Sequence, residues 1–254
     1  MMLPYEADVA MQRYPWANVL LITATCFISL AAIADSNVFD KLALGQRHIP
    51  KYVLDFPILN DVPNHTRHYP VTYQSSGYFT YGFVHGGIVH LAGNMLFLFV
   101  FGNAVNAKIG HIRYLVIYFL LLAASAAIQV RYIPIPLRIC GASGAIYGIM
   151  GMFIVLYPRN EITCFWFSFY RMSEHSGTFE ISSIWIVLYW VAFDVLMLKL
   201  ELAGNVGIHA HLAGFTIGVL ITIAAILMRL IKSDDCEENL LEAVGLMGQW
   251  QEVK

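Results

Sequence analysis

Residues 140–151 read CGASGAIYGIMG, with one serine and four glycines at the start of a long apolar segment. Glycines spaced four apart let two membrane helices approach closely, and a serine among them can serve the same purpose. Ser143 can instead be a nucleophile, provided that other segments bring it a base and a site that stabilises an anion. The rest of the chain decides between these two interpretations.

The composition is typical of an integral membrane protein. Of the 254 residues, 58% are hydrophobic and 13% are charged, with a mean hydropathy of +0.63, whereas about a quarter of the residues of soluble domains are charged. The net charge of −2 and the lack of a basic cluster give no indication of a nucleic-acid partner. Apolar segments near the length of about 20 residues that a spanning helix needs are 17–34, 83–101, 114–130, 142–157, 181–198 and 208–231. We therefore predict an all-α, polytopic bundle of six transmembrane helices.

Two segments lie outside these predicted spans. The connection 35–80 is rich in His and Pro and carries aromatic residues, so we expect a long loop at the lipid headgroup level, without regular structure. The tail 232–254 is acidic and then amphipathic, with apolar residues at helical spacing from Leu240 to Met247, and we expect a short exposed helix. The chain would thus divide into a membrane core, 1–231, and a cytoplasmic tail.

The positive charges predict the orientation. With the long loop left aside, eight Lys and Arg residues lie on the side of the termini and three on the other side. Such an excess marks the cytoplasmic side, so both termini are expected there. The first apolar segment also resembles a secretory signal with a cleavage site after Ala34, but it is longer than a usual signal core, and we expect an uncleaved helix.

Polar side chains in spanning helices are costly and are candidates for function. His90 and Asn94 are four residues apart and therefore share one face of the second predicted helix. His211 lies near the start of the sixth predicted helix, where a neutral imidazole can accept the proton of Ser143. The oxyanion of such a reaction needs donors worth about 3–4 kcal/mol each. Backbone N–H groups beside Ser143 and the side chains of His90 and Asn94 are the candidates.

Small residues would allow the serine and the histidine to meet. A pair of glycines four residues apart follows each of them: Gly144 and Gly148 after the serine, and Gly214 and Gly218 after the histidine. Tyr147 lies one turn beyond the serine, on the same face, where its ring can pack against the imidazole. Each feature alone is more often a packing feature, but together they favour a serine hydrolase.

Three other polar residues are less decisive. Asp194 is the one clear carboxylate in the predicted spans, and it could orient a histidine or, near the outer end of its helix, simply be solvated. His85 is expected to bond to loop backbone. His209 is two residues from His211 and would point away from it in a helix.

The segments HGGIVHLAGN (85–94), GASGAIYG (141–148) and HAHLAGFTIG (209–218), in this order, resemble the rhomboid intramembrane serine proteases. The resemblance covers the whole predicted core, residues 17–231, and the joint pattern is specific although each part is not. The absence of a seventh predicted helix is similar to the basic bacterial form of the family.

The resemblance implies a role for each candidate. Ser143 would be the nucleophile and His211 its base, in a dyad without an acid. The oxyanion hole would be formed by His90, Asn94 and the backbone at Ser143. Tyr147 would stack on the catalytic histidine.

The chain departs from the family pattern at two places. A Trp-Arg pair that many rhomboids carry in the first loop is replaced by Ser76 and Gly77, and a glutamate after the second helix is replaced by Asn106. Both are structural supports, so the departures concern loop rigidity and stability rather than chemistry. Gly141 matches the family and would shape the turn before the serine.

By resemblance, the protein is a serine endopeptidase that cleaves transmembrane segments of other membrane proteins, in the inner membrane of a bacterium, without a cofactor or a metal. Water would reach the site through a cavity lined by His85, His90 and the third loop. A gate for the substrate would consist of a cap, residues 201–207, and aromatic residues of the fifth helix: Trp185, Tyr189, Trp190 and Phe193.

Two alternatives remain at this point. A non-catalytic rhomboid relative would bind membrane clients without cutting them, although such relatives usually lack the serine or the histidine. A haem- or metal-binding membrane protein could use some of the nine histidines, although the H-E-x-x-H zinc signature is absent.

Overall fold

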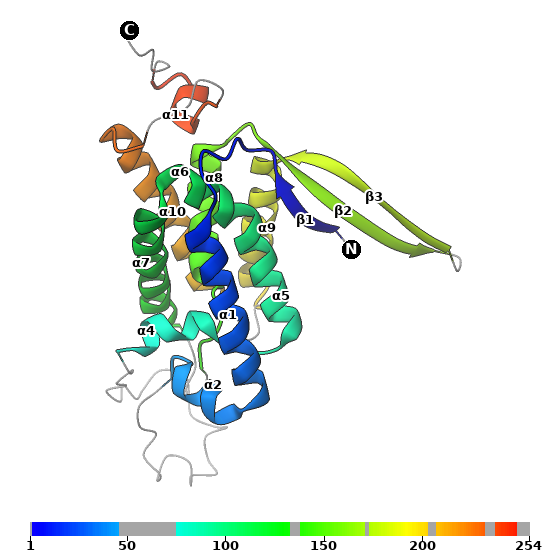
Figure 1. Cartoon of the computed structure of the whole chain (residues 1–254), viewed down its shortest axis with the longest axis vertical. Helices are drawn as coiled ribbons and strands as arrows, with labels where there is room; N and C mark the ends of the chain where they lie inside the picture. The colour runs from blue at the N-terminus through cyan, green and yellow to red at the C-terminus, as the bar shows by residue number, and fades with distance from the viewer. Residues whose placement is uncertain are drawn as a thin grey trace.

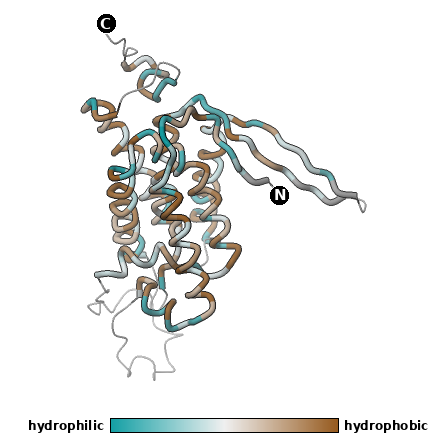
Figure 2. Tube along the Cα trace, in the orientation of Figure 1, coloured by the Kyte–Doolittle hydropathy of each residue, from teal (hydrophilic) through white to brown (hydrophobic). Residues whose placement is uncertain are grey.

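The computed structural model describes residues 2–45, 75–132, 138–170, 173–202, 207–231 and 237–247. Long helices run side by side in a bundle, and a three-stranded sheet projects from one end of it (Figure 1). Hydrophobic residues follow the helices along most of their length (Figure 2). The chain is therefore mostly helical, as predicted, with a sheet that the sequence analysis did not predict.

Most predicted spans appear with small changes in their limits. The structure has α1 (Trp16–Ala34), α7 (His111–Gln129), α9 (Ser183–Lys199) and α10 (Ile208–Leu227). The second span begins later than predicted, at Ile88, and also ends later, at Ile109. It runs unbroken through α5 (Ile88–Phe97), the π-helical turn η2 (Leu98–Gly102) and α6 (Asn103–Ile109).

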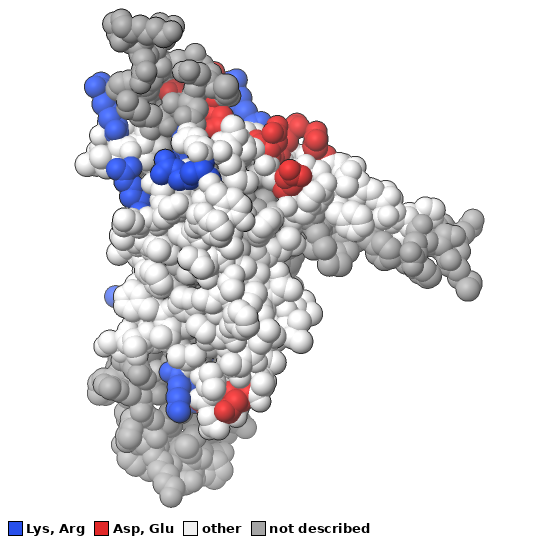
Figure 3. Space-filling view, viewed as in Figure 1, with Lys and Arg blue, Asp and Glu red and all other residues white. Residues whose placement is uncertain are grey.

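By length and composition, four of these helical segments can cross a membrane: Trp16–Ala34, Ile88–Ile109, His111–Gln129 and Ile208–Leu227. On the face in Figure 3, a broad belt almost free of charged side chains separates charged residues at the two ends of the molecule. The protein is therefore a multi-pass integral membrane protein.

Helix α8 (Ser143–Leu156) forms the centre of the bundle, and every residue from Gly144 to Leu156 is buried. Its 14 residues extend only about 21 Å at 1.5 Å per residue, less than the bilayer core of about 30 Å. Because other helices surround α8, it need not match the bilayer thickness. Its first residue, Ser143, can therefore lie below the membrane surface.

The projecting sheet consists of β1 (Met2–Ala7), β2 (Glu161–Tyr170) and β3 (Ser173–Ser182), paired antiparallel in the order β1-β2-β3. The first two residues of the predicted fifth span, Ile181 and Ser182, belong to β3 rather than to α9. Strand β2 reads EITCFWFSFY, and its β-branched and aromatic residues favour a strand.

The connection 35–80 is structured at both of its ends, which corrects the prediction of a loop without regular structure. Helix α2 (Ser36–Leu42) begins beside the Asp35 carboxylate, which accepts the Asn37 N–H at 2.8 Å. Helix α4 (Gly77–Thr80) and the 3₁₀ turn η1 (Tyr81–Phe83) end the connection. The expected position at the headgroup level concerns residues 46–74, which lie outside the described part of the chain.

The described part of the tail, residues 237–247, is docked on the core rather than exposed, which corrects a second prediction. Helix α11 (Leu240–Ala243) packs against α8, and Leu241 is only 7% exposed. Ion pairs also attach the tail: Lys108 Nζ lies 3.7 Å from Glu237 Oε2, and Arg159 Nη1 lies 3.0 Å from Glu238 Oε2.

Candidate active site

The site begins with a backbone contact between α8 and α10. A Cβ atom added to Gly214 would lie 1.9 Å from the Gly144 carbonyl oxygen, and one added to Gly218 would lie 2.0 Å from the Gly148 carbonyl oxygen. Real Cβ contacts are never so short, so these two helices touch only because α10 has glycine there. The contact lies directly after Ser143 in α8 and shortly after His211 in α10.

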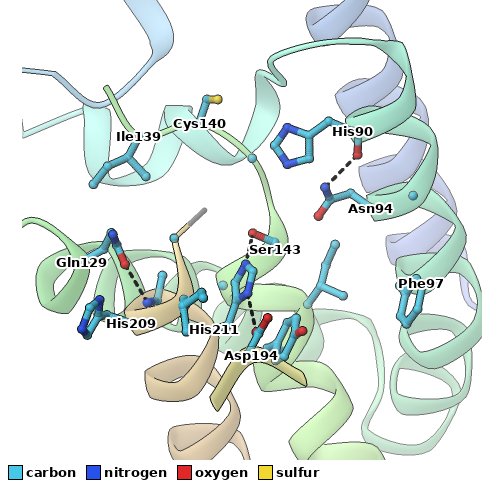
Figure 4. Close-up of a pocket in the computed structure, with 18 of the residues that line it drawn as sticks. His90, Asn94, Phe97, Gln129, Ile139, Cys140, Ser143, Asp194, His209 and His211 are labelled. Atoms are coloured by element: carbon cyan, nitrogen blue, oxygen red, sulfur yellow. Dashed lines mark hydrogen bonds and ion pairs between the residues drawn. The ribbon is translucent and has the colours of Figure 1, made fainter. Parts of the chain in front are cut away.

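This contact brings the candidate nucleophile and base together. His211 Nε2 lies 2.7 Å from Ser143 Oγ, a hydrogen-bond distance (Figure 4). The ring of Tyr147 stacks on the imidazole, with centroids 4.3 Å apart and planes inclined by 9°. The base is thus held against the hydroxyl by a bond at its edge and by an aromatic ring on its face.

A carboxylate lies on the other side of the imidazole. Asp194 Oδ2 is 2.8 Å from His211 Nδ1, and the Tyr147 side chain lies close to Asp194 as well. Asp194 is only 5% exposed, so the solvated alternative for this residue is wrong. The geometry therefore contains a chain of three groups, Ser143, His211 and Asp194, where the resemblance implied a dyad without an acid.

His90 and Asn94 face the same cavity from α5 (Figure 4). One Asn94 amide hydrogen is donated to the His90 carbonyl oxygen, at 2.8 Å, which leaves its second hydrogen available. The Gly86 N–H points to His90 Nδ1 at 3.4 Å, so in the neutral ring Nε2 carries the hydrogen. Both side chains can therefore donate a hydrogen bond into the cavity.

His85 supports the turn before the nucleophile. Burial lowers the pKa of His85, which precedes α5, to about 3, so the ring is neutral. Its Nε2 accepts the Ala142 N–H at 3.4 Å, and its Nδ1–H therefore donates to Ser29 Oγ at 2.8 Å. His85 is 1% exposed and does not line the cavity, which corrects its predicted place beside the water path.

Gly141 occupies a backbone conformation that favours glycine, with φ at 105°. A Cβ atom there would also lie 2.8 Å from the His90 ring. The glycine therefore lets the chain pass beside His90 immediately before Ser143.

The cavity has a volume of about 830 Å³ and extends between α5, α8, α9 and α10. Of the predicted gate residues, Trp190 and Phe193 line it, and the Trp190 ring packs edge to face on Phe97 of α5, with centroids 5.4 Å apart. Trp185 and Tyr189 are more than half exposed and do not line it. Most of the predicted cap, residues 203–206, lies outside the described residues.

Gln129 was not among the predicted site residues. Its Oε1 accepts the Ala210 N–H at 2.9 Å and so binds the first turn of α10 just before His211. A polar amide near the end of a predicted span was the available signal for Gln129.

The ring of His209 stacks on the ring of Tyr132, with centroids 3.9 Å apart.

Among the described residues, His, Cys, Asp and Glu side chains form no group of three that could hold a metal ion. The polar groups around His211 are instead arranged for proton transfer.

The Rhomboid domain matches residues 72–228. The chain belongs to the rhomboid family. A relative from Bacillus subtilis (strain 168), named "Putative rhomboid protease YdcA", is 32% identical over 149 residues, which are 56% of this chain and 63% of the relative. The match thus spans less than two thirds of that relative.

This rhomboid makes other contacts at the two positions where it departs from the family pattern, Asn106 and the Ser76–Gly77 pair. Asn106 is fully buried, and its Oδ1 accepts the Asn18 N–H of α1 at 3.2 Å. A Cβ atom on Gly77 would lie 2.8 Å from a methyl group of Leu44, so the first loop packs closely at this glycine. The two departures therefore fall at positions that are well packed here.

Proposed function

We propose that this rhomboid protein is an intramembrane serine endopeptidase. The observation that carries the proposal is the 2.7 Å contact between Ser143 Oγ and His211 Nε2, at the edge of a large cavity inside a membrane protein. Membership of the rhomboid family supports the same reaction. A family member that only binds clients would have no need of this contact.

The reaction would follow the general course of serine proteases. Ser143 Oγ attacks the scissile carbonyl carbon while its proton passes to His211 Nε2. The C–N bond then breaks, the proton moves from His211 to the leaving amine, and the acyl group stays on Ser143. Water next attacks this ester, with His211 taking and returning the proton, and a carboxyl product leaves.

The oxyanion formed on the substrate would be held by three donors. The N–H of Ser143, at the first position of α8, has no partner within its own helix. The free amide hydrogen of Asn94 and the Nε2–H of His90 complete the set. Such donors act strongly in a site that excludes bulk water.

The substrates would be transmembrane segments of other membrane proteins. Trp190 of α9 and Phe97 of α5 both line the cavity and touch each other, so separation of these two rings would admit a segment from the lipid. Helices that unwind easily and have small residues at the cut suit such a site. We infer both termini in the cytoplasm of a bacterial cell, with water reaching Ser143 from the outer side.

The proposal is tested with the purified protein in liposomes and a single-span substrate carrying small residues in its membrane segment. The parent is expected to cut the substrate, and Ser143→Ala and His211→Ala are expected to leave it intact. Cleavage at the parent's rate by either variant would contradict the assignment.

A further inference from the structure

We infer that Asp194 is a positioning residue of this reaction, which fixes the orientation and the protonated nitrogen of His211. The inference rests on the proposed proteolysis and replaces the acid-free dyad by a chain of three groups. Asp194 lies outside the three sequence motifs, the family resemblance implies no role for it, and the sequence alone left open whether it orients a histidine or is solvated.

Asp194 is a buried carboxylate in a membrane helix. A carboxylate in a spanning helix is costly and is found almost always with a partner. Asp194 is 5% exposed, and among the ion pairs of the described residues its partner is His211. The side chain therefore has a specific role in the bundle rather than a place in solvent.

The Asp194 carboxylate also determines which ring nitrogen of His211 carries the hydrogen. A neutral imidazole carries one hydrogen, on Nδ1 or on Nε2. The Asp194 carboxylate only accepts, so the 2.8 Å contact requires the hydrogen to be on Nδ1. Nε2 is then free to accept the Ser143 proton at 2.7 Å. Without the carboxylate, the ring could adopt the other tautomer, in which Nε2 cannot act as a base.

Tyr147 lies beside both members of the Asp194–His211 pair. Its side chain is close to the carboxylate, and its ring stacks on His211. Groups from α8, α9 and α10 thus meet at one point: Ser143 and Tyr147, Asp194, and His211. When His211 receives the proton, the nearby negative charge stabilises the imidazolium that forms.

The variant Asp194→Asn tests this role, with Asp8→Asn as the matched control, because Asp8 is exposed on the sheet side of the molecule. Each protein is placed in liposomes, its active sites are titrated with a fluorophosphonate, and kcat and KM are measured per active site. We expect Asp194→Asn to lower kcat about 10²–10⁴-fold, because the Asn amide favours the wrong tautomer, with KM within about threefold of the parent. Asp8→Asn should match the parent in both constants.

Results that overturn the inference are equally specific. Folded Asp194→Asn with a kcat within about twofold of the parent would remove Asp194 from the reaction. A loss confined to the number of titrated sites, with kcat unchanged, would show a structural role only. A parent that neither cuts nor binds the fluorophosphonate would overturn the proposed function and, with it, this inference.

A second measurement needs no folded variant at position 194. The ¹⁵N shifts of histidine in the parent report which ring nitrogen carries the hydrogen, and His211→Gln identifies the signals of His211. We expect neutral His211 to carry its hydrogen on Nδ1. Hydrogen on Nε2 would overturn the inference, whether or not the protein cleaves a substrate.

Discussion

Gly214 of α10 lies against the backbone of Gly144 of α8, so closely that a Cβ atom on Gly214 would be 1.9 Å from the Gly144 carbonyl oxygen. This contact explains how residues that are 68 positions apart in the sequence come within hydrogen-bond distance, since Ser143 and His211 lie next to it on the two helices. The packing of two glycine-bearing helices and the geometry of the candidate active site are therefore one structural feature.

Gly214→Ala should separate the two helices. The added methyl group must displace backbone rather than a flexible side chain, and overpacking of this kind costs about 3 kcal/mol of unfolding free energy or more. Thermal melting in detergent and the cleavage rate should both fall. Gly93→Ala is the control for melting, because a Cβ atom there meets nothing within 4 Å. Equal melting temperatures for the two variants would contradict the close contact.

Asn94→Ala should slow cleavage without abolishing it. Loss of one oxyanion donor lowers kcat about 10²–10³-fold in serine proteases, and two donors remain here. The KM value should change little, because the donor acts on the transition state. Kinetics in liposomes, with the exposed Asn37→Ala as control, measure the effect. An unchanged kcat would exclude Asn94 from the oxyanion hole.

Tyr147 has two separable groups, a ring and a hydroxyl. Tyr147→Phe keeps the ring that stacks on His211 and loses only the hydroxyl, whereas Tyr147→Leu loses the ring as well. We expect the leucine variant to lose about two- to tenfold more activity than the phenylalanine variant, because an aromatic stack contributes about 0.5–1.5 kcal/mol beyond its area. Equal rates for the two variants would show that the ring does not orient the base.

The docked tail should contribute to stability. Leu241 is 7% exposed, and truncation of a buried leucine to alanine costs about 2–5 kcal/mol. Leu246 is 74% exposed and offers a matched control in the same tail. Thermal melting in detergent should therefore fall for Leu241→Ala and stay near the parent for Leu246→Ala. A lower melting temperature for Leu246→Ala than for Leu241→Ala would contradict the packing of the tail on α8.

Hydropathy was sufficient to predict the bundle, because lipid requires long apolar segments whatever their partners. The meeting of Ser143 with His211 was also predictable, since the spaced glycines beside each residue indicate a close helix contact. The limits of the second span were not, because the π-helical turn at Leu98–Gly102 has no clear hydropathy signal.

Other features depend on contacts that no local pattern describes. Asp194 reaches His211 because α9 packs beside α10 with a particular rotation, and one carboxylate in an apolar segment does not reveal that rotation. The sheet was missed although Phe165 and Trp166 lie in a segment of high strand propensity, because β2 pairs with β1 at the distant N-terminal end of the chain. Leu241 was expected to be exposed because the tail is acidic. The tail carboxylates of Glu237 and Glu238 are instead paired with Lys108 and Arg159.

The central claim, that Ser143 is a nucleophile activated by His211, is tested most directly by mapping a covalent adduct. The purified protein is treated with a fluorophosphonate and its peptides are analysed by mass spectrometry. We expect the phosphonyl group on Ser143 in the parent and its loss in His211→Ala. An adduct on another residue, or equal labelling of Ser143 without His211, would contradict the account.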